Sequence, residues 1–468
     1  DNLSAGGSDE GDYNNIAPRL NLNYKLGRRS SLRGGYGIFY EKIPYAIYSD
    51  ALQQNTTSAD YRKQIQYFVD QGILPADTDV NAVTFEGNLS GFASNVGYLQ
   101  GPSAESLQEQ REGVFSNERR ILNPNRYDNP YTHQMALGYQ LQMNNNSLFF
   151  VDLVHNRSFN LLRLRNLNAA APYKIDPDNP QVRTIAEADA SRPLPIIDGN
   201  SAVINGETLT GVARNVVMSE TAGESRYYAA SFNFQKARGE DEYSFRLNYT
   251  LSYLENNTED INFRAMDAND FEAEWGPSIN DRRHIINTIF TYYPVDNLSL
   301  TVAGLIQSGQ PINRTPLPVS YVVVDENGNP VQQQLTAPDG TPAFDQNGDP
   351  ILVDVTTSTT DLNGDGASFG DAYVGNSDRF PGESRNSDRL PWSNTFDVGL
   401  QYDFQLGSNE LQLRADVFNV FNTQNLSGYS NNATQSNQIQ PGSAASGRLI
   451  RRNASAPRQF QFTLRYVF

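Results

Sequence analysis

A short acidic stretch has the composition of a cation-binding loop. Oxygen-bearing side chains stand at every second position, at Asp361, Asn363 and Asp365, and the glycines between them allow the chain to turn. Calcium loops supply carboxylate and amide oxygens at this spacing. Such loops usually place an acid at position twelve, which is an alanine here, so Asp371 or a more distant acid would replace it. We hypothesise that Asp361, Asn363, Asp365 and Asp371 bind calcium, the only cofactor that the sequence suggests; the alternative is that no cation binds.

Other residues with metal-binding side chains have simpler interpretations. The stretches 325–329 and 345–349 also alternate acids and amides, but each contains Asn-Gly, which favours a hairpin turn. The three histidines, His133, His155 and His284, lie far apart and lack the spacing of metal ligands. We expect them to be hydrogen-bonding groups at an interface or in a lumen.

The chain shows no sequence pattern typical of an enzyme. It has no cysteine, no Gly-x-Ser-x-Gly and no phosphate-binding loop. The acidic pairs Glu240/Asp241 and Glu272/Glu274 fall in turns and loops, where solvated charge is favoured over a glycosidase dyad. We therefore expect no covalent chemistry. The net charge of −17 also argues against nucleic acid as a partner.

Alternating apolar and polar residues dominate the rest of the chain. In the last stretch, Phe460, Phe462, Leu464, Tyr466 and Phe468 alternate with mostly polar residues. A period of two places alternate side chains on opposite faces of a strand. A terminal strand with one apolar face is an aggregation hazard in water, whereas in an outer-membrane barrel it meets lipid on one side and the lumen on the other.

The same pattern predicts eleven strands of about ten residues, a length that spans a bilayer when the strand is tilted. They form five pairs and one terminal strand, near 18–26, 32–40, 135–141, 149–153, 228–234, 243–253, 283–293, 298–306, 396–402, 411–417 and 460–468. About four residues join the strands of a pair, whereas long segments join the pairs. We expect these long extracellular loops at 41–131, 156–225, 254–282, 308–394 and 420–456, with helix-like composition at 59–71 and 104–112.

This alternation of short and long connections favours an all-β fold, a transmembrane antiparallel β-barrel with short periplasmic turns and long outer loops. No run of about 18 apolar residues is present, so no transmembrane helix is expected. An odd strand count cannot close with both barrel ends in the periplasm, and open edges are costly in lipid. We therefore expect 1–468 to be part of a larger barrel whose remaining strands lie outside it. The start, Asp1 to Gly7, resembles a loop and not a signal peptide.

Several phrases together resemble the C-terminal half of a TonB-dependent outer-membrane transporter, closest to the Oar-like subgroup with a carboxypeptidase-regulatory-like N-terminal domain. The phrases occur in family order at 17–20, 33–40, 249–252, 281–284, 307–311, 361–366, 385–387, 416–422 and 457–460. The resemblance implies twenty-two strands in all, of which these eleven would be the last. The family's plug domain and its N-terminal TonB-contacting box have no counterpart in these residues.

The resemblance implies active import across the bacterial outer membrane, with lipid around the barrel and a TonB complex contacted through the part not seen here. This chain would form the wall and the loops that select the substrate, whose identity the sequence does not reveal. The alternative is a scaffold barrel whose large loops bind a surface lipoprotein or another envelope protein. A third hypothesis, a soluble secreted β-protein, predicts extraction without detergent.

Aromatic residues near the strand ends are expected to form girdles at the two membrane interfaces. They are Tyr24, Tyr40, Tyr253, Tyr292, Tyr293 and Tyr402. The two tryptophans, Trp275 and Trp392, lie in or beside the long loops. They are candidates for substrate contact or for packing anchors, and packing is the favoured interpretation.

Overall fold

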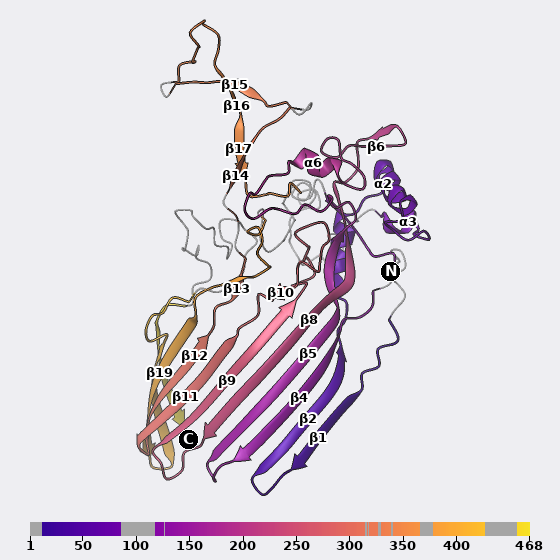
Figure 1. The fold of residues 1–468 in the computed structure, drawn as a ribbon. Coiled ribbons are helices and arrows are strands. Elements are labelled where there is room, and N and C mark those ends of the chain that lie inside the picture. The colour runs from indigo at the N-terminus through magenta and orange to yellow at the C-terminus, as the bar shows by residue number, and fades with distance from the viewer. Residues whose placement is uncertain are drawn as a thin grey trace.

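One antiparallel sheet of long strands dominates the structure (Figure 1). This computed structural model describes residues 12–85, 118–125, 127–313, 316, 318–325, 329–337, 340–365, 378–425 and 456–468. The long strands follow one another across the sheet in chain order. They are β1 (Arg19–Lys25), β2 (Ser30–Tyr40), β4 (Tyr131–Gln142), β5 (Ser147–Asn166), β8 (Asn215–Lys236), β9 (Tyr243–Asn256), β11 (His284–Val295), β12 (Leu298–Gln307), β19 (Ser393–Leu406), β20 (Asn409–Phe418) and β21 (Gln459–Val467).

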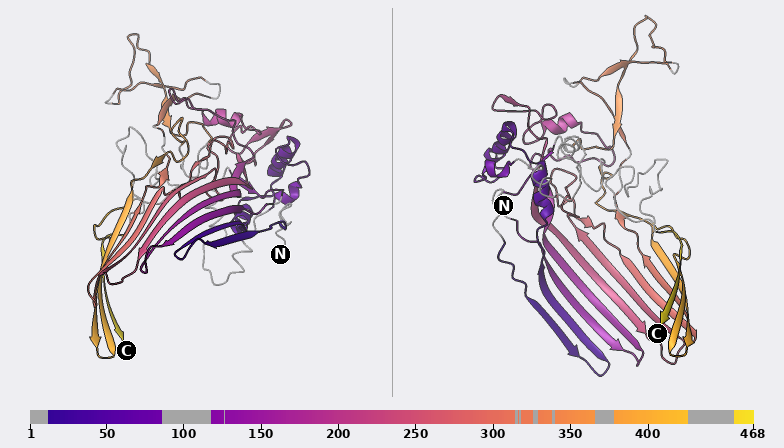
Figure 2. Two further views of the ribbon diagram at one scale, coloured as in Figure 1. Left: turned by 60° about the horizontal axis from the view of Figure 1, so that its bottom comes forward. Right: turned by 180° about the vertical axis from the view of Figure 1, so that it is seen from behind.

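These elements confirm the eleven expected strands and their pairing. Short turns join β1 to β2, β4 to β5, β8 to β9, β11 to β12 and β19 to β20, and these turns lie at one end of the sheet (Figure 1). The long connections gather at the other end. The sheet curves along its width, as the two views in Figure 2 show. β1 and β21 are the two ends of the strand order, and their side chains are exposed.

The register separates apolar from polar side chains across the whole sheet. One row across β4, β5, β8 and β9 consists of Leu137, Leu153, Ala230 and Leu251. Apolar side chains on this face remain exposed, as Phe462 does at 80%. Since this apolar face is uncovered along so much of the sheet, the expected contact with lipid fits it better than a soluble sandwich does.

Two strands are much longer than a bilayer requires. β5 has 20 residues and β8 has 22, whereas about ten residues cross a bilayer. The expected loop 156–225 is therefore too long, because 156–166 and 215–225 are strand. The short β3 (Glu118–Ile121) pairs in parallel with the outer part of β8. Four successive residues there, from Val216 to Ser219, are buried, so the period-two pattern that would have shown a strand is lost.

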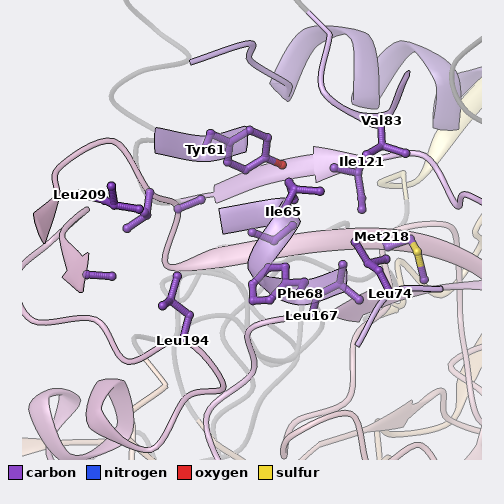
Figure 3. Packing of buried hydrophobic residues seen from close by; sticks show 14 of the residues in the cluster. Tyr61, Ile65, Phe68, Leu74, Val83, Ile121, Leu167, Leu194, Leu209 and Met218 are labelled. Atoms are coloured by element: carbon purple, nitrogen blue, oxygen red, sulfur yellow. The ribbon is translucent and has the colours of Figure 1, made fainter. Parts of the chain in front are cut away.

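The long connections fold into a layer with its own apolar core (Figure 3). It includes α1 (Tyr45–Gln54), α2 (Ala59–Asp70), α3 (Val80–Val83), α6 (Ile185–Ala190) and the hairpin of β6 (Ala202–Ile204) with β7 (Glu207–Leu209). α2 confirms the helix expected at 59–71, whereas the one expected at 104–112 lies outside the described residues. No helix in the described part of the chain is long and apolar enough to cross a membrane.

α2 shows why this layer is stable. The Ser58 hydroxyl caps the helix by accepting the backbone N–H of Tyr61. Tyr61, Ile65 and Phe68 recur at helical spacing and are fully buried against Leu209 and other apolar residues. The helix is thus attached to the strand extensions and not left free above the sheet.

A narrow β-arm projects from the outer layer between β12 and β19 (Figure 1). It contains β14 (Val319–Val322) paired with β17 (Thr356–Thr359) and β15 (Gln332–Gln334) paired with β16 (Leu352–Asp354). At its base, β13 (Pro311–Ile312) pairs with β18 (Asp388–Arg389), and β10 (Gly276–Pro277) pairs with β9. The stretch 345–349 closes a tight turn, since the Asp345 carboxylate accepts the backbone N–H groups of Asn347 and Asp349. The expected turn at 345–349 is confirmed. In the other stretch the Asp325 carboxylate accepts the Asn329 N–H, but the Asn-Gly pair expected to form the turn lies outside the described residues.

The two faces of β9 should respond differently to a charge. Leu247 lies on the apolar face and Asn248 on the polar face, one residue away. We expect Leu247→Arg to lower the free energy of unfolding by about 2–4 kcal/mol in a lipid bilayer, because arginine is costly at mid-depth on a lipid-facing surface. Asn248→Arg should change it far less. Guanidinium unfolding in lipid vesicles measures both, and equal losses would contradict this assignment of faces.

Candidate functional site

The face opposite the apolar one is a polar wall. Hydroxyl groups bond between neighbouring strands in several pairs, including Thr132 with Ser158 at 2.8 Å and Ser231 with Thr250 at 2.9 Å. Asn248 faces the same side as Thr250. Hydroxyls and amides both donate and accept hydrogen bonds, so this wall can contact water or a polar solute without a fixed charge requirement.

One ion pair crosses the polar wall at a glycine. The Arg33 guanidinium of β2 binds the Asp152 carboxylate of β5 through Nε and Nη2, with N–O distances of 2.8–3.2 Å. The strand between them carries Gly138. A Cβ there would lie 2.3 Å from the Asp152 carboxylate and 2.6 Å from Arg33 Nε. The glycine is therefore required for the two side chains to meet over β4.

Arg385 connects the long outer connections to one another. Its side chain is 1% exposed and pairs with Glu259, which is equally buried. Nε donates to the Glu274 backbone carbonyl at 2.8 Å, and Nη2 donates to the Asn256 backbone carbonyl at 2.5 Å. Its guanidinium also lies over the Phe263 ring. One residue of the connection before β19 thus binds the connection between β9 and β11 at several points.

Other arginine–carboxylate pairs link the same two chain segments. The Glu274 carboxylate is fully buried and binds Arg379 through two 2.8 Å contacts. The expectation that Glu272/Glu274 is solvated loop charge is therefore wrong for Glu274. Buried charge requires a partner, and the partner lies 105 residues away in the sequence, where no local pattern reveals it. Asp281 is likewise buried and pairs with Arg389.

A buried group of three charged side chains links β3 to these connections. Glu118 of β3 binds Arg264 at 2.7 Å and Arg120 at 3.2 Å. Burial alone would raise the pKa of the Glu118 carboxyl, but the two arginines outweigh burial and lower it. Glu118 is therefore a stable anion at neutral pH, and the outer connections form one charge-paired assembly.

The calcium hypothesis concerns a loop of this assembly. Asp361 Oδ1 accepts the Gly364 N–H and Asn363 Oδ1 accepts the Asp365 N–H, both at 2.9 Å. Asp371 lies outside the described residues. Within the described ranges, no group of three or more histidine, cysteine or acidic side chains is placed to hold a metal ion. The calcium site remains a prediction that depends on Asp371 or another acid.

Asp378, which the sequence pattern did not mark, supports the same loop. Its side chain is buried, and Oδ2 accepts the backbone N–H groups of Leu362 and Asn363 at 2.7 and 2.8 Å. Burial raises the pKa of the Asp378 carboxyl well above its usual range, and the nearby Asp365 and Asp361 raise it further. The loop is therefore held by a carboxyl group that keeps its proton to a higher pH than an ordinary aspartate does.

Each tryptophan ring contacts a strand side chain near the outer end of the sheet. Trp392 is 53% exposed and stacks on His284 of β11, with ring centroids 5.5 Å apart. The Arg226 guanidinium of β8 lies over the Trp275 ring at 5.1 Å. His284 and Arg226 occupy apolar-face positions of their strands. This placement supports the packing interpretation, and substrate contact by either tryptophan stays a prediction.

The three histidines also lie on the apolar face, near its outer end. His133 Nδ1 is 2.7 Å from the Tyr36 hydroxyl, and His284 Nδ1 is 2.9 Å from the Tyr249 hydroxyl. His155 stacks on Tyr228. They belong to an aromatic band at the interface, one of the two expected roles. Most of the expected girdle tyrosines share this face, whereas Tyr293 points to the polar one by strand alternation.

Comparison with known proteins identifies the family. A family model described as an outer membrane beta barrel domain matches residues 3–461, and the chain belongs to that family. The fold is thus that of an outer-membrane β-barrel, whose apolar face meets lipid and whose polar face meets the lumen. The long connections therefore lie at the outer surface of the bacterial outer membrane, and the short turns lie in the periplasm.

Solved structures with a similar arrangement of strands are outer-membrane transporters and receptors. They include the outer membrane transporter YddB from Escherichia coli (11% identity, TM-score 0.43). The match covers 97% of this chain and 40% of the YddB chain. Two others are a mutant of the ferric enterobactin receptor PfeA from Pseudomonas aeruginosa (13% identity, TM-score 0.44) and the siderophore receptor PirA from Acinetobacter baumannii (13% identity, TM-score 0.43). Each of these matches covers 96% of this chain and 40% of the receptor chain. The chain thus spans two fifths of these structures. No curated protein matches the sequence.

Removing the Arg385 guanidinium should loosen the outer connections. Arg385→Gln leaves the Glu259 carboxylate buried without its partner, which costs about 3–5 kcal/mol for comparable pairs. We expect faster hydrogen exchange in 378–392 and 256–281, measured by mass spectrometry, with the strands below unchanged. Arg238→Gln removes an exposed pair with Asp296 and should have little effect. Equal exchange in the two variants would show that Arg385 does not hold the assembly together.

The Asp378 contact should weaken as pH rises. A carboxyl whose pKa is raised in the folded protein contributes most below the pKa of an unfolded aspartate, and stability is lost as pH rises toward the raised pKa. Asp378→Asn keeps an acceptor oxygen without the charge. We expect slower exchange at Leu362 and Asn363 in the variant at pH 8 and no difference at pH 4. Exposed Asp178→Asn serves as the control.

The same exchange measurement tests the calcium hypothesis. Added calcium chloride should slow exchange at Leu362 and Asn363 in the wild type, and a chelator should reverse the effect. Asp361→Asn should reduce the response, because it removes one of the carboxylates expected to bind the ion. A wild-type exchange rate that does not respond to calcium would remove this site.

Proposed function

We propose that this chain forms part of the wall and the outer loops of a barrel that imports a substrate across the outer membrane with energy from a TonB complex. The observation that carries the proposal is the asymmetry of the sheet. Its polar face leads to short turns at the periplasmic end and to a large, internally bonded assembly at the outer end. A polar wall below an ordered outer assembly supplies both parts of a transport path: a surface that can select a solute and a lumen that a polar solute can cross.

In this proposal the outer assembly captures the substrate and the wall guides it inward. Buried arginine pairs keep the outer connections in a defined arrangement, so a binding surface costs less ordering entropy when a ligand arrives. Hydroxyl and amide groups on the wall then exchange hydrogen bonds with a passing solute. The chain performs no covalent chemistry.

The proposed barrel requires further strands beyond these eleven. An unpaired strand edge in lipid exposes backbone N–H and C=O groups, each costing several kcal/mol. β1 and β21 would therefore pair with other strands of the same barrel. A plug inside the barrel and the TonB contact would likewise come from that remaining part. Membership of the Oar-like subgroup is part of this proposal and rests on the sequence phrases.

The alternative proposal, a scaffold that binds a surface lipoprotein or another envelope protein, is favoured by the projecting β-arm. The arm exposes Val324, Phe344 and Leu352 at 44%, 56% and 51%. Isolated two-stranded ribbons are only marginally stable, and exposed apolar side chains on them are suited to a protein contact.

Uptake and co-purification separate the two proposals. The medium around wild-type cells, cells lacking this protein and cells lacking TonB would be analysed by mass spectrometry for solutes that only the wild type removes. Import predicts the same unremoved solutes in both mutants. The scaffold predicts no such solutes and a stoichiometric envelope protein on the purified barrel, which is lost when 319–359 is deleted.

A further inference from the structure

A hollow lies on the lipid-facing side of the sheet, centred on Ala230. Its volume is about 670 Å³, and it is lined by strands β4, β5, β8 and β9. Ala230 lies between Leu153 and Leu251 in the cross-strand register, and Tyr228 and Phe232 flank it along β8. A methyl group among these large side chains leaves a gap. The hollow is within the size range of small-molecule sites.

The outer end of the hollow carries polar and aromatic groups. His155 stacks on Tyr228 with centroids 4.4 Å apart, and its Nδ1 is 3.1 Å from the Tyr227 carbonyl. The Arg283 guanidinium lies over the Tyr253 ring at 4.5 Å. The side chains of these residues line the hollow directly, whereas Tyr227 does not. An apolar floor with one polar, aromatic end matches a molecule that is itself apolar along its length and polar at one end.

The charge at this end favours an anion. Arg283 is 3.6 Å from Asp281, but that carboxylate also forms a closer pair with Arg389. Arg283 Nε is buried and has no hydrogen-bond partner. The neighbouring pairs Arg226–Glu255 and Arg157–Glu224 are each balanced. Arg283 and Arg389 thus share one carboxylate, so positive charge exceeds negative here although the whole chain carries a net charge of −17.

We propose that this hollow binds a lipid of the outer leaflet that carries a phosphate headgroup. One acyl chain occupies the space over Ala230 between Leu153 and Leu251. The phosphate binds the terminal nitrogens of Arg283, whose side chain is 38% exposed. The hollow opens sideways onto the face that meets lipid, so its occupant comes from the bilayer. The proposal requires only this membrane placement and is independent of the substrate carried by the barrel.

A second hollow on the same face provides a comparison. It lies over Ala415, between Leu400 and Phe462, with a volume of about 370 Å³. Its only charged lining residue, Arg414, binds Asp416 at 2.8 Å. Apolar space without an unbalanced cation should accept acyl chains with no preference for the headgroup.

Native mass spectrometry of the purified protein in detergent tests the proposal. Dioleoyl phosphatidic acid and dioleoyl phosphatidylcholine would be titrated separately, since they share acyl chains and differ in headgroup. We expect the wild type to retain phosphatidic acid about tenfold more strongly, as one charge-assisted contact allows. Arg283→Gln should abolish this preference. Ala230→Leu should reduce retention of both lipids, and Ala415→Leu should leave the preference intact.

Several results would overturn the proposal. They are an unchanged preference in Arg283→Gln, equal effects of the two alanine substitutions, or equal retention of both lipids by the wild type. If Arg283→Gln does not fold, the salt dependence of lipid retention by the wild type still tests the proposal. Raising the salt from 0.05 to 0.5 M must then weaken phosphatidic acid retention and leave phosphatidylcholine unchanged, because salt screens exposed charge. A salt-independent preference would exclude Arg283 as the cause.

Discussion

The structure depends on one constraint, that backbone N–H and C=O groups inside a bilayer must pair with one another. Strand pairing satisfies this constraint, because each strand from β1 to β21 is hydrogen-bonded to its neighbours in the sheet. For example, β11 pairs with β9 and β12 over nearly its whole length. Because pairing fixes the register, it also fixes which side chains reach lipid. The apolar rows, the aromatic band and the polar wall all follow from this single ladder.

Outside the bilayer the same chain is held by a different force. Water satisfies exposed backbone there, so the connections are organised by buried apolar residues and by arginine–carboxylate pairs. Glu118, Glu259, Glu274 and Asp281 are all buried, and each meets at least one arginine. Removing such charges from water is costly, and the cost is offset only when partners and extra hydrogen bonds are present together. The pairs therefore select one arrangement of the loops rather than adding much net stability.

Sequence reasoning could predict the sheet because a period of two is local information. It gave every long strand, the short turns and α2. It failed where the contact is not local: Glu274 and Arg379 lie far apart in the sequence, and Asp378 supports 361–365 from outside the motif. It also ended β5 too early and began β8 too late, because residues buried on both faces, such as Val216 and Val217, show no alternation. The calcium ligands could be proposed from composition but not tested by it.

The outward extensions of β5 and β8 have a mechanical consequence. They are continuous with the membrane-embedded parts of the same strands, so the helical layer and the wall share one hydrogen-bonded ribbon. The register shifts at Ser158 to Leu162, and Asn160 there adopts φ 56°. A bulge of this kind bends a strand and concentrates its twist. The bulge near Asn160 therefore sets the direction in which the ribbon leaves the membrane-embedded wall and supports the helical layer.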